Sequence, residues 1–179
     1  CGGFTQGFVQ AGYNPVLGVD MWSDATTTYK YNFPNSEILN EDITKVSTSA
    51  LLAAAKVSIG DVDGIIGGPP CQGFSVSGKR LIDDPRNVLY KSFVEYVGEI
   101  QPKFFVMENV PGLVSMAKGA VKDAVIEDFE SRGYNVSWKI LAADDYGVPQ
   151  HRRRVFFVGL NKKIFGEKKF EFPTPFESD

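Results

Sequence analysis

Short apolar runs alternate with amphipathic segments along most of the chain. The apolar runs are bounded by turn-forming residues and predict strands at 15–20, 38–43, 63–67, 103–107, 136–141 and 155–159. Apolar residues at helical spacing predict helices at 4–11, 23–32, 49–57, 85–101 and 121–132. Strands that alternate with helices indicate an α/β protein with a doubly wound, mostly parallel, Rossmann-like sheet.

Composition narrows the class of protein. The chain has 179 residues, of which 43% are hydrophobic and 23% are charged, as in a globular domain. No apolar run approaches the roughly 18 residues of a membrane span. Two cysteines form no disulfide framework and indicate an intracellular protein, and with one histidine they do not predict a metal site. A net charge of −3 means that any surface for nucleic acid is local or lies outside this chain.

The most distinctive stretch follows the strand at 63–67 and runs from Gly67 to Ser75. Two prolines stiffen the backbone before Cys71, and a glycine two residues later lets it turn. A lone cysteine is most often a small buried residue, but this setting is typical of a nucleophile presented at a strand end. The long segment that follows, 68–84, has the length of a functional lid, and its residues 75–80 are a candidate to close over a substrate.

A second reactive group ends the strand at 103–107, where Glu108 is followed by Asn109. Ligands of doubly wound sheets bind outside the carboxyl ends of the strands. We therefore expect Cys71 and Glu108 to reach the same edge of the sheet. Arg152 and Arg154 alternate at the entry to the last strand and fall on one face, where they can orient Glu108, a base or phosphates. Each feature also has an ordinary structural explanation, but their joint occurrence favours an active site.

The first segment carries residues suited to a nucleoside. The glycine turn Cys1-Gly2-Gly3 precedes a helix, and the next strand ends on Asp20, which can accept hydrogen bonds from ribose hydroxyls. Asp42 lies at the end of the strand predicted at 38–43 and can accept a hydrogen bond from an adenine amino group. Taken alone, the glycine turn and Asp20 are better explained by an ordinary tight turn with a helix-capping acid, and Asp42 is equally well explained as a solvated turn carboxylate.

Taken together, Pro69-Pro70-Cys71-Gln72, Glu108-Asn109-Val110 and Gln150-His151-Arg152-Arg153-Arg154 resemble the motifs of the cytosine-5 DNA methyltransferase family. The resemblance implies a methyl transfer from S-adenosyl-L-methionine to a flipped-out cytosine of double-stranded DNA, through a covalent bond between Cys71 and C6 of the base. It implies catalytic roles for Cys71, Glu108, Arg152 and Arg154. Cofactor contacts are implied for Cys1, Gly2, Gly3, Asp20, Met21, Asp42, Ile43, Pro70 and Leu89, and substrate contacts for Gln72, Ser75, Ser77, Lys79 and Asn109.

The resemblance also bears on domain organisation. Residues 1–161 are expected to form the catalytic and cofactor-binding domain, with its first strand upstream of Cys1. Residues 162–179 read as a linker toward a target-recognition region outside the chain, and the protein is expected in the cytoplasm, near the nucleoid, if it is bacterial. Two alternatives stay open: a tRNA cytosine-5 methyltransferase, and a non-catalytic relative that binds cofactor or DNA.

Overall fold

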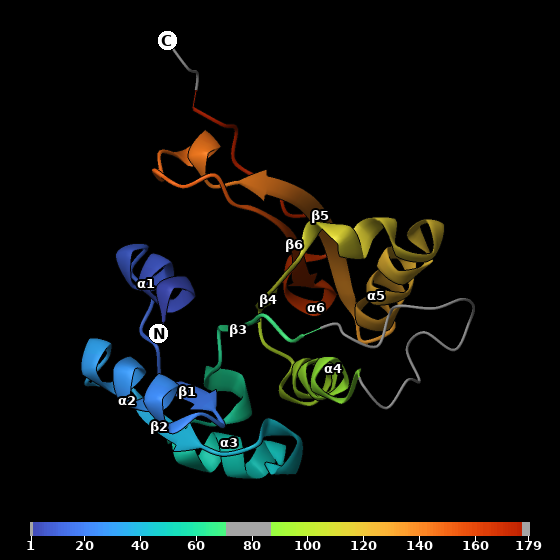
Figure 1. Cartoon of the computed structure of the whole chain (residues 1–179). Helices are drawn as coiled ribbons and strands as arrows, with labels where there is room; N and C mark the ends of the chain where they lie inside the picture. Colours follow the sequence, from blue (N-terminus) through green and yellow to red (C-terminus); the bar gives the residue numbers. More distant parts are fainter. Residues whose placement is uncertain (1, 71–86, 177–179) are drawn as a thin grey trace. The chain divides into compact units, whose positions relative to one another are not determined.

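The computed structural model describes residues 2–70 and 87–176, which belong to two compact units, Cys1–Val62 and Asp63–Asp179 (Figure 1). Unit 1 contains α1 (Gly3–Gln10), β1 (Leu17–Asp20), α2 (Ser23–Asn32), β2 (Glu37–Asn40), η1 (Ile43–Lys45), α3 (Thr48–Ala55) and η2 (Ile59–Asp61). Strands β1 and β2 pair in parallel, with Asp20 opposite Asn40 at their carboxyl ends.

Local sequence explains the elements of unit 1. The side chain of Ser47 accepts a hydrogen bond from the Ala50 amide and caps α3, whose Ala and Leu residues favour helix. Gly2 adopts a φ of 84° before α1, and a Cβ there would lie 2.3 Å from the ring of Phe33. Glycine at this position therefore allows both the turn and the packing of α1 on α2.

Unit 2 is built on a four-stranded sheet of order β3-β4-β6-β5. Its elements are β3 (Gly64–Gly67), α4 (Val88–Ile100), β4 (Phe104–Asn109), η4 (Pro111–Gly119), α5 (Ala120–Glu130), β5 (Tyr134–Ala142), η5 (Asp144–Tyr146), β6 (Arg153–Asn161) and α6 (Lys162–Phe165). β3 and β4 are parallel, whereas β6 pairs antiparallel with both β4 and β5. Strands β3, β4 and β5 thus share one direction, and β6 is inserted between β4 and β5 in the other.

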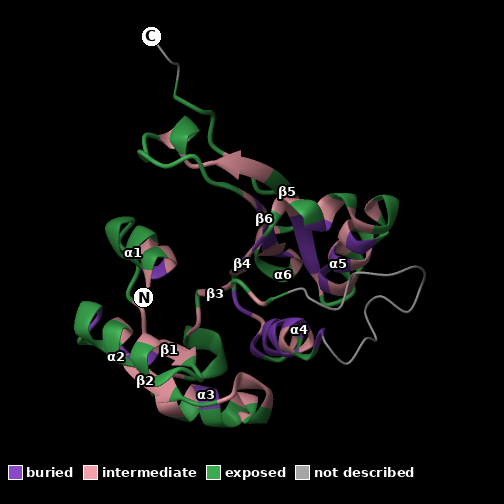
Figure 2. Cartoon of the chain, viewed as in Figure 1, coloured by how far each residue is buried: buried purple, intermediate pink, exposed green. Residues whose placement is uncertain are grey.

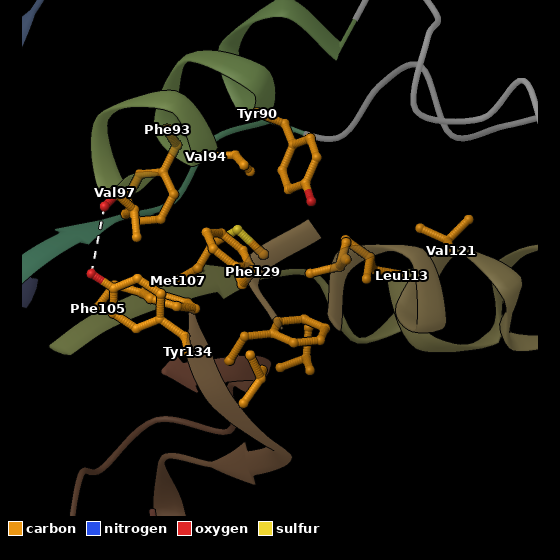
Figure 3. Close-up of a cluster of buried hydrophobic side chains, with 14 residues drawn as sticks. Tyr90, Phe93, Val94, Val97, Phe105, Met107, Leu113, Val121, Phe129 and Tyr134 are labelled. Carbon is orange, nitrogen blue, oxygen red and sulfur yellow. Dashed lines mark hydrogen bonds between the residues drawn. The ribbon is translucent and has the colours of Figure 1, made fainter. Parts of the chain in front are cut away.

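The core of unit 2 lies where α4 and α5 pack on one face of this sheet (Figure 2). Aromatic rings dominate it: Phe105 stacks on Phe129 with centroids 4.0 Å apart, and Tyr134 meets Phe105 edge-on (Figure 3). The Tyr134 hydroxyl donates to the Pro102 carbonyl at 2.9 Å, and burial raises the pKa of Tyr134 far above its usual range. Such a packed, hydrogen-bonded core holds β4 and β6 rigidly.

The α/β, doubly wound prediction is confirmed, and two details refine it. β2 ends at Asn40, so Asp42 lies in the following turn rather than at a strand end. The predicted linker begins with α6 and returns to η5, where the Phe176 amide donates to the Asp145 carbonyl at 2.9 Å.

None of the described helices has the length and apolar character that crossing a membrane requires. Within the described ranges, no cluster of three or more metal-ligating side chains occurs.

Candidate active site

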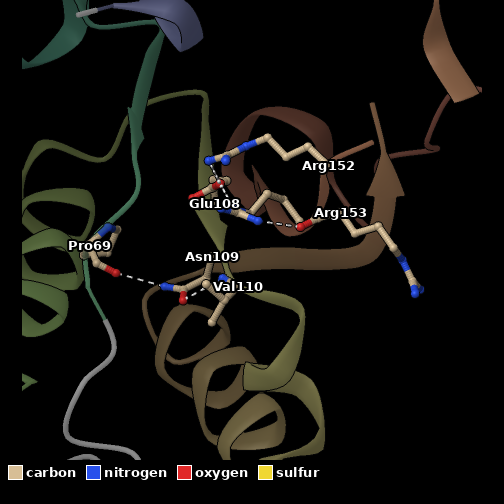
Figure 4. A network of polar contacts seen from close by, with 7 residues as sticks. Pro69, Glu108, Asn109, Val110, Arg152 and Arg153 are labelled. Carbon is tan, nitrogen blue, oxygen red and sulfur yellow. Dashed lines mark hydrogen bonds and ion pairs between the residues drawn. The ribbon is translucent and has the colours of Figure 1, made fainter. Parts of the chain in front are cut away.

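An ion pair at the carboxyl end of β4 forms the centre of the site in unit 2. The Arg154 Nε donates to Glu108 Oε1 at 2.8 Å, and Arg152 Nη2 lies 4.0 Å from the same oxygen (Figure 4). The sheet register explains the contact, because Glu108 is opposite Phe156 and Arg154 is two residues before Phe156 on the same face of β6. The two arginines that the sequence analysis expects to orient Glu108, a base or phosphates thus both lie within 4.0 Å of Glu108 Oε1.

Arg153 lies between these two arginines and extends away from Glu108, as strand alternation requires (Figure 4). Its side chain is exposed, while its carbonyl accepts a 2.7 Å hydrogen bond from Arg154 Nη1. Arg154 therefore holds the Glu108 carboxylate and its own backbone neighbour at once. Its side chain and that of Glu108 are each 26% exposed, so the pair is open to a ligand on one side.

The other carboxylate oxygen of Glu108 faces the end of β3. A Cβ built on Gly68 would lie 3.1 Å from Glu108 Oε2, closer than ordinary van der Waals contact. Glu108 thus lies between Arg154 on β6 and the backbone of Gly68, which precedes Cys71 by three residues. The order of the strands, β3 beside β4 beside β6, produces this arrangement.

Asn109 continues the connection between β4 and β3. Its side-chain Nδ2 donates to the Pro69 carbonyl at 2.9 Å, and its Oδ1 accepts from the Val110 amide at 2.9 Å (Figure 4). The residue is 6% exposed. The sequence interpretation assigned Asn109 to the substrate, but the structure directs both ends of its amide to the protein backbone.

In unit 1, the paired ends of β1 and β2 carry the residues predicted to bind a nucleoside. Asp20 is exposed, its Oδ1 accepts from the Trp22 amide at 2.9 Å, and its carbonyl accepts from Asn40 Nδ2 at 3.1 Å. Met21 and Trp22 beside it are 64% and 73% exposed. A carboxylate next to exposed apolar side chains suits the ribose and the base of a nucleoside. Trp22, which the sequence analysis does not name, is the most exposed of the side chains beside Asp20 described above.

The carboxylate of Asp42 accepts more hydrogen bonds from the protein than that of Asp20. Its Oδ1 accepts from the Thr44 hydroxyl at 2.8 Å and from the Thr44 amide at 3.1 Å, and it caps η1. These hydrogen bonds lower the pKa of Asp42, and the bond from the Thr44 hydroxyl has a larger effect than the bond from the amide. The residue therefore stays ionised and its turn is rigid. Ile43, the other predicted contact of this turn, is the first residue of η1.

The remaining predicted site residues divide into two groups. Leu89 is half-buried near the start of α4, and Pro70 is exposed directly after Pro69. The others, including the proposed nucleophile, lie outside the described residues: Cys1, Cys71, Gln72, Ser75, Ser77 and Lys79.

The turn before β6 carries a further polar pair. His151 Nδ1 lies 2.8 Å from Asp144 Oδ2, and this hydrogen bond lowers the pKa of Asp144. The Arg152 carbonyl accepts from the Ala143 amide at 2.9 Å, which closes the turn between β5 and β6. These contacts place the backbone of Arg152 beside that of β5 and so help to aim its side chain.

Comparison with known proteins identifies the family of this chain. The model of the C-5 cytosine-specific DNA methylases matches residues 1–178, and the chain belongs to this family. The type II methyltransferase M.DdeI of Desulfomicrobium norvegicum is 53% identical over 165 residues, which cover 89% of this chain and 38% of the relative. M.AquIA of a Picosynechococcus species is 40% identical over 183 residues, covering 97% of this chain and 72% of the relative.

A solved structure supports the fold. A prophage-encoded protein of E. coli, described as a candidate DNA modification methyltransferase, superposes with a TM-score of 0.75 at 35% identity. The match covers 94% of this chain and 46% of that protein. The chain thus spans less than half the length of M.DdeI and of this crystallised protein.

Proposed function

We propose that the protein is a DNA (cytosine-5-)-methyltransferase that uses S-adenosyl-L-methionine. The observation that carries the proposal is the position of Glu108, held by Arg154 and facing the backbone of Gly68, three residues before the family's Cys71. Attack on a cytosine ring requires a thiol nucleophile and a carboxyl group at the same base, and Glu108 lies beside Gly68 of the segment that leads to Cys71.

The proposed reaction begins with addition of the Cys71 thiolate to C6 of the base. Glu108 donates a hydrogen bond or proton to N3 of the ring, which stabilises the addition product and makes C5 nucleophilic. S-adenosyl-L-methionine supplies the methyl group that C5 takes. Loss of the C5 proton to a base and breakage of the bond between Cys71 and C6 then re-form the C5–C6 double bond and release the thiolate, and any proton that N3 took returns to Glu108.

Arg154 and Arg152 orient Glu108 in this proposal. Ion pairs at this degree of exposure contribute about 0.2–1 kcal/mol to stability, so their main effect is on geometry.

DNA methyltransferases are among the enzymes that rotate the target base out of the duplex, and we propose that this chain acts on a base in that state.

For the cofactor, Asp20 suits the ribose hydroxyls, and the exposed Met21 or Trp22 suits the adenine ring. The Asp42 turn is proposed to face the adenine amino group. We also propose that bases around the target are read by a region outside residues 1–179, since the match covers only 38% of M.DdeI and 46% of the crystallised E. coli prophage protein. A DNA substrate implies that the protein works inside the cell, at the nucleoid if its source is a bacterium.

The test incubates the full-length protein with cofactor and duplex DNA that carries 5-fluorocytosine. Fluorine at C5 blocks the final elimination, so an adduct that survives denaturing electrophoresis is expected with the native protein and not with Cys71→Ser. Glu108→Gln keeps the side-chain shape but removes the acid, and should slow adduct formation by about 10²–10⁴-fold.

A parallel reaction with structured RNA separates the tRNA alternative. Adduct formation on RNA and not on DNA would replace the substrate, and an adduct that persists in Cys71→Ser would contradict the mechanism. A native protein that binds DNA and cofactor without forming any adduct would favour the non-catalytic alternative.

A further inference from the structure

The ladder between β3 and β4 ends before the two proposed reactive segments are reached. Its last pair joins Gly67 to Met107, one residue before Gly68 and Glu108. Beyond that point the backbone of Pro69 has no N–H to donate, so its carbonyl is the group through which a neighbour can hold it. Asn109 holds that carbonyl, with Nδ2 to oxygen at 2.9 Å across 40 positions of sequence.

The Asn109 side chain is itself held in place. Its Oδ1 accepts from the Val110 amide at 2.9 Å, which orients Nδ2 toward Pro69. At 6% exposure, the amide offers little surface to a substrate. Asn109 is also the residue directly after Glu108, so one short segment carries both the proposed acid and the tie to the strand that leads to Cys71.

We infer that Asn109 is a positioning residue that sets the distance between the backbone of Pro69, two residues before Cys71, and Glu108, rather than a substrate contact. The inference rests on the proposed function. It differs from the sequence-based expectation, which placed Asn109 among the groups that touch DNA. A loss of about 1 Å in placement can lower the rate of a positioned reaction by about 100-fold.

Asn109→Asp separates the two hydrogen bonds of this side chain. An introduced carboxylate still accepts from the Val110 amide, but it cannot donate to the Pro69 carbonyl. When protonated, the same group can donate again, and burial raises the pKa of a carboxyl so that this happens in mildly acid solution. Asn109→Ala can neither donate nor ionise, so it serves as the second variant.

The chain offers a matched control at the opposite end of the same sheet. Asn161 is 2% exposed, its Nδ2 donates to the Pro102 carbonyl at 3.2 Å, and its Oδ1 accepts from the Lys163 amide at 3.0 Å. Asn161→Asp therefore makes the same chemical change in the same kind of contact, away from Glu108. Its effect reports any loss that comes from destabilising unit 2 alone.

The experiment measures the rate of adduct formation on 5-fluorocytosine DNA by the full-length protein, with dissociation constants for DNA and cofactor measured separately. At about pH 8 we expect Asn109→Asp to react about 100-fold more slowly, with both constants within about threefold of the native values. The ratio of the variant rate to the native rate should rise as the pH falls toward about 6. Asn109→Ala should show a deficit without this recovery, and Asn161→Asp should react within about threefold of the native rate.

Three results would overturn the inference: a native-like rate for both Asn109 variants, a deficit that appears only as weaker DNA binding, or an equal deficit in Asn161→Asp. If Asn109→Asp does not fold, the rate of adduct formation and the DNA affinity of Asn109→Ala test the first two of these results. Failure of the native protein to form any adduct would instead contradict the proposed function, which keeps the two conclusions apart.

Discussion

The two carboxylate oxygens of Glu108 have different neighbours. Oε1 is bound by Arg154, and Oε2 faces Gly68, where even a methyl group would lie 3.1 Å away. Glycine at position 68 therefore has a role that is independent of backbone conformation: it leaves room for the carboxylate.

Gly68→Ala tests this spacing. The added methyl should displace Glu108 by a few tenths of an ångström and lower the rate of methyl transfer by about tenfold, because reactivity depends steeply on placement. The free energy of unfolding should change by no more than about 0.5 kcal/mol, since Gly68 is exposed. Gly112→Ala is the matched control, because a Cβ there meets nothing within 4 Å. An unchanged rate in Gly68→Ala, or an equal loss in Gly112→Ala, would contradict this account.

At the level of elements, α4 and α5 are joined by a hydrogen bond from the Tyr90 hydroxyl to Asp128 Oδ2 at 2.8 Å. Tyr90 is fully buried. Burial raises the pKa of Asp128, and the Tyr90 hydrogen bond opposes part of that effect. The contact therefore orders the first turn of α4 while it places a carboxyl group where ionisation is disfavoured.

The raised pKa of Asp128 makes the stability of unit 2 depend on pH. The native state holds this proton more tightly than the unfolded chain, so it binds more protons between the ordinary carboxyl pKa of about 4 and the raised value. Stability contributed by this group is therefore lost as the pH rises through that window. Asp128→Asn keeps an acceptor for Tyr90 but does not titrate.

We expect the unfolding free energy of the native protein, minus that of Asp128→Asn, to fall as the pH rises from about 3 to about 7. Urea unfolding followed by Trp138 fluorescence measures it in unit 2, with Trp22→Phe as the common background because the chain has two tryptophans. A difference that is flat or that increases with pH would show that Asp128 is not desolvated.

At the scale of the whole molecule, the two units differ in their cores. Among the described residues of unit 1, the buried hydrophobic side chains are Phe33 and Leu51, whereas unit 2 contains the cluster around Phe105 and Phe129. Folding has to offset a large loss of conformational entropy, and small chains with little buried apolar surface rarely do so.

We therefore expect a peptide of residues 1–62 to show no cooperative unfolding transition by circular dichroism, and a peptide of residues 63–179 to unfold cooperatively. The cluster of buried side chains in unit 2 provides the reason. Cooperative melting of the 1–62 peptide would show that the short β1–β2 sheet is stable with far less buried surface than other domains of its size.

Much of this organisation could be predicted before the structure. The run at 103–107 was interpreted as a buried strand ending at Glu108, and β4 spans Phe104–Asn109. The helix predicted at 23–32 is α2, Ser23–Asn32. The end of β2 was misplaced, because Asp42 and Thr44 form a local hydrogen-bonded turn that an apolar pattern does not reveal.

The sequence by itself determined most of the strands and helices and the position of Glu108 near the end of a strand, because propensity and apolar spacing depend on neighbouring residues. Only the tertiary structure decided that β6 runs antiparallel between β4 and β5, which brings Arg154 to Glu108. It also decided that Asn109 holds the Pro69 carbonyl, 40 positions earlier in the chain. Such contacts join residues far apart in sequence, and they exist only once the strands have assembled in a definite order and direction.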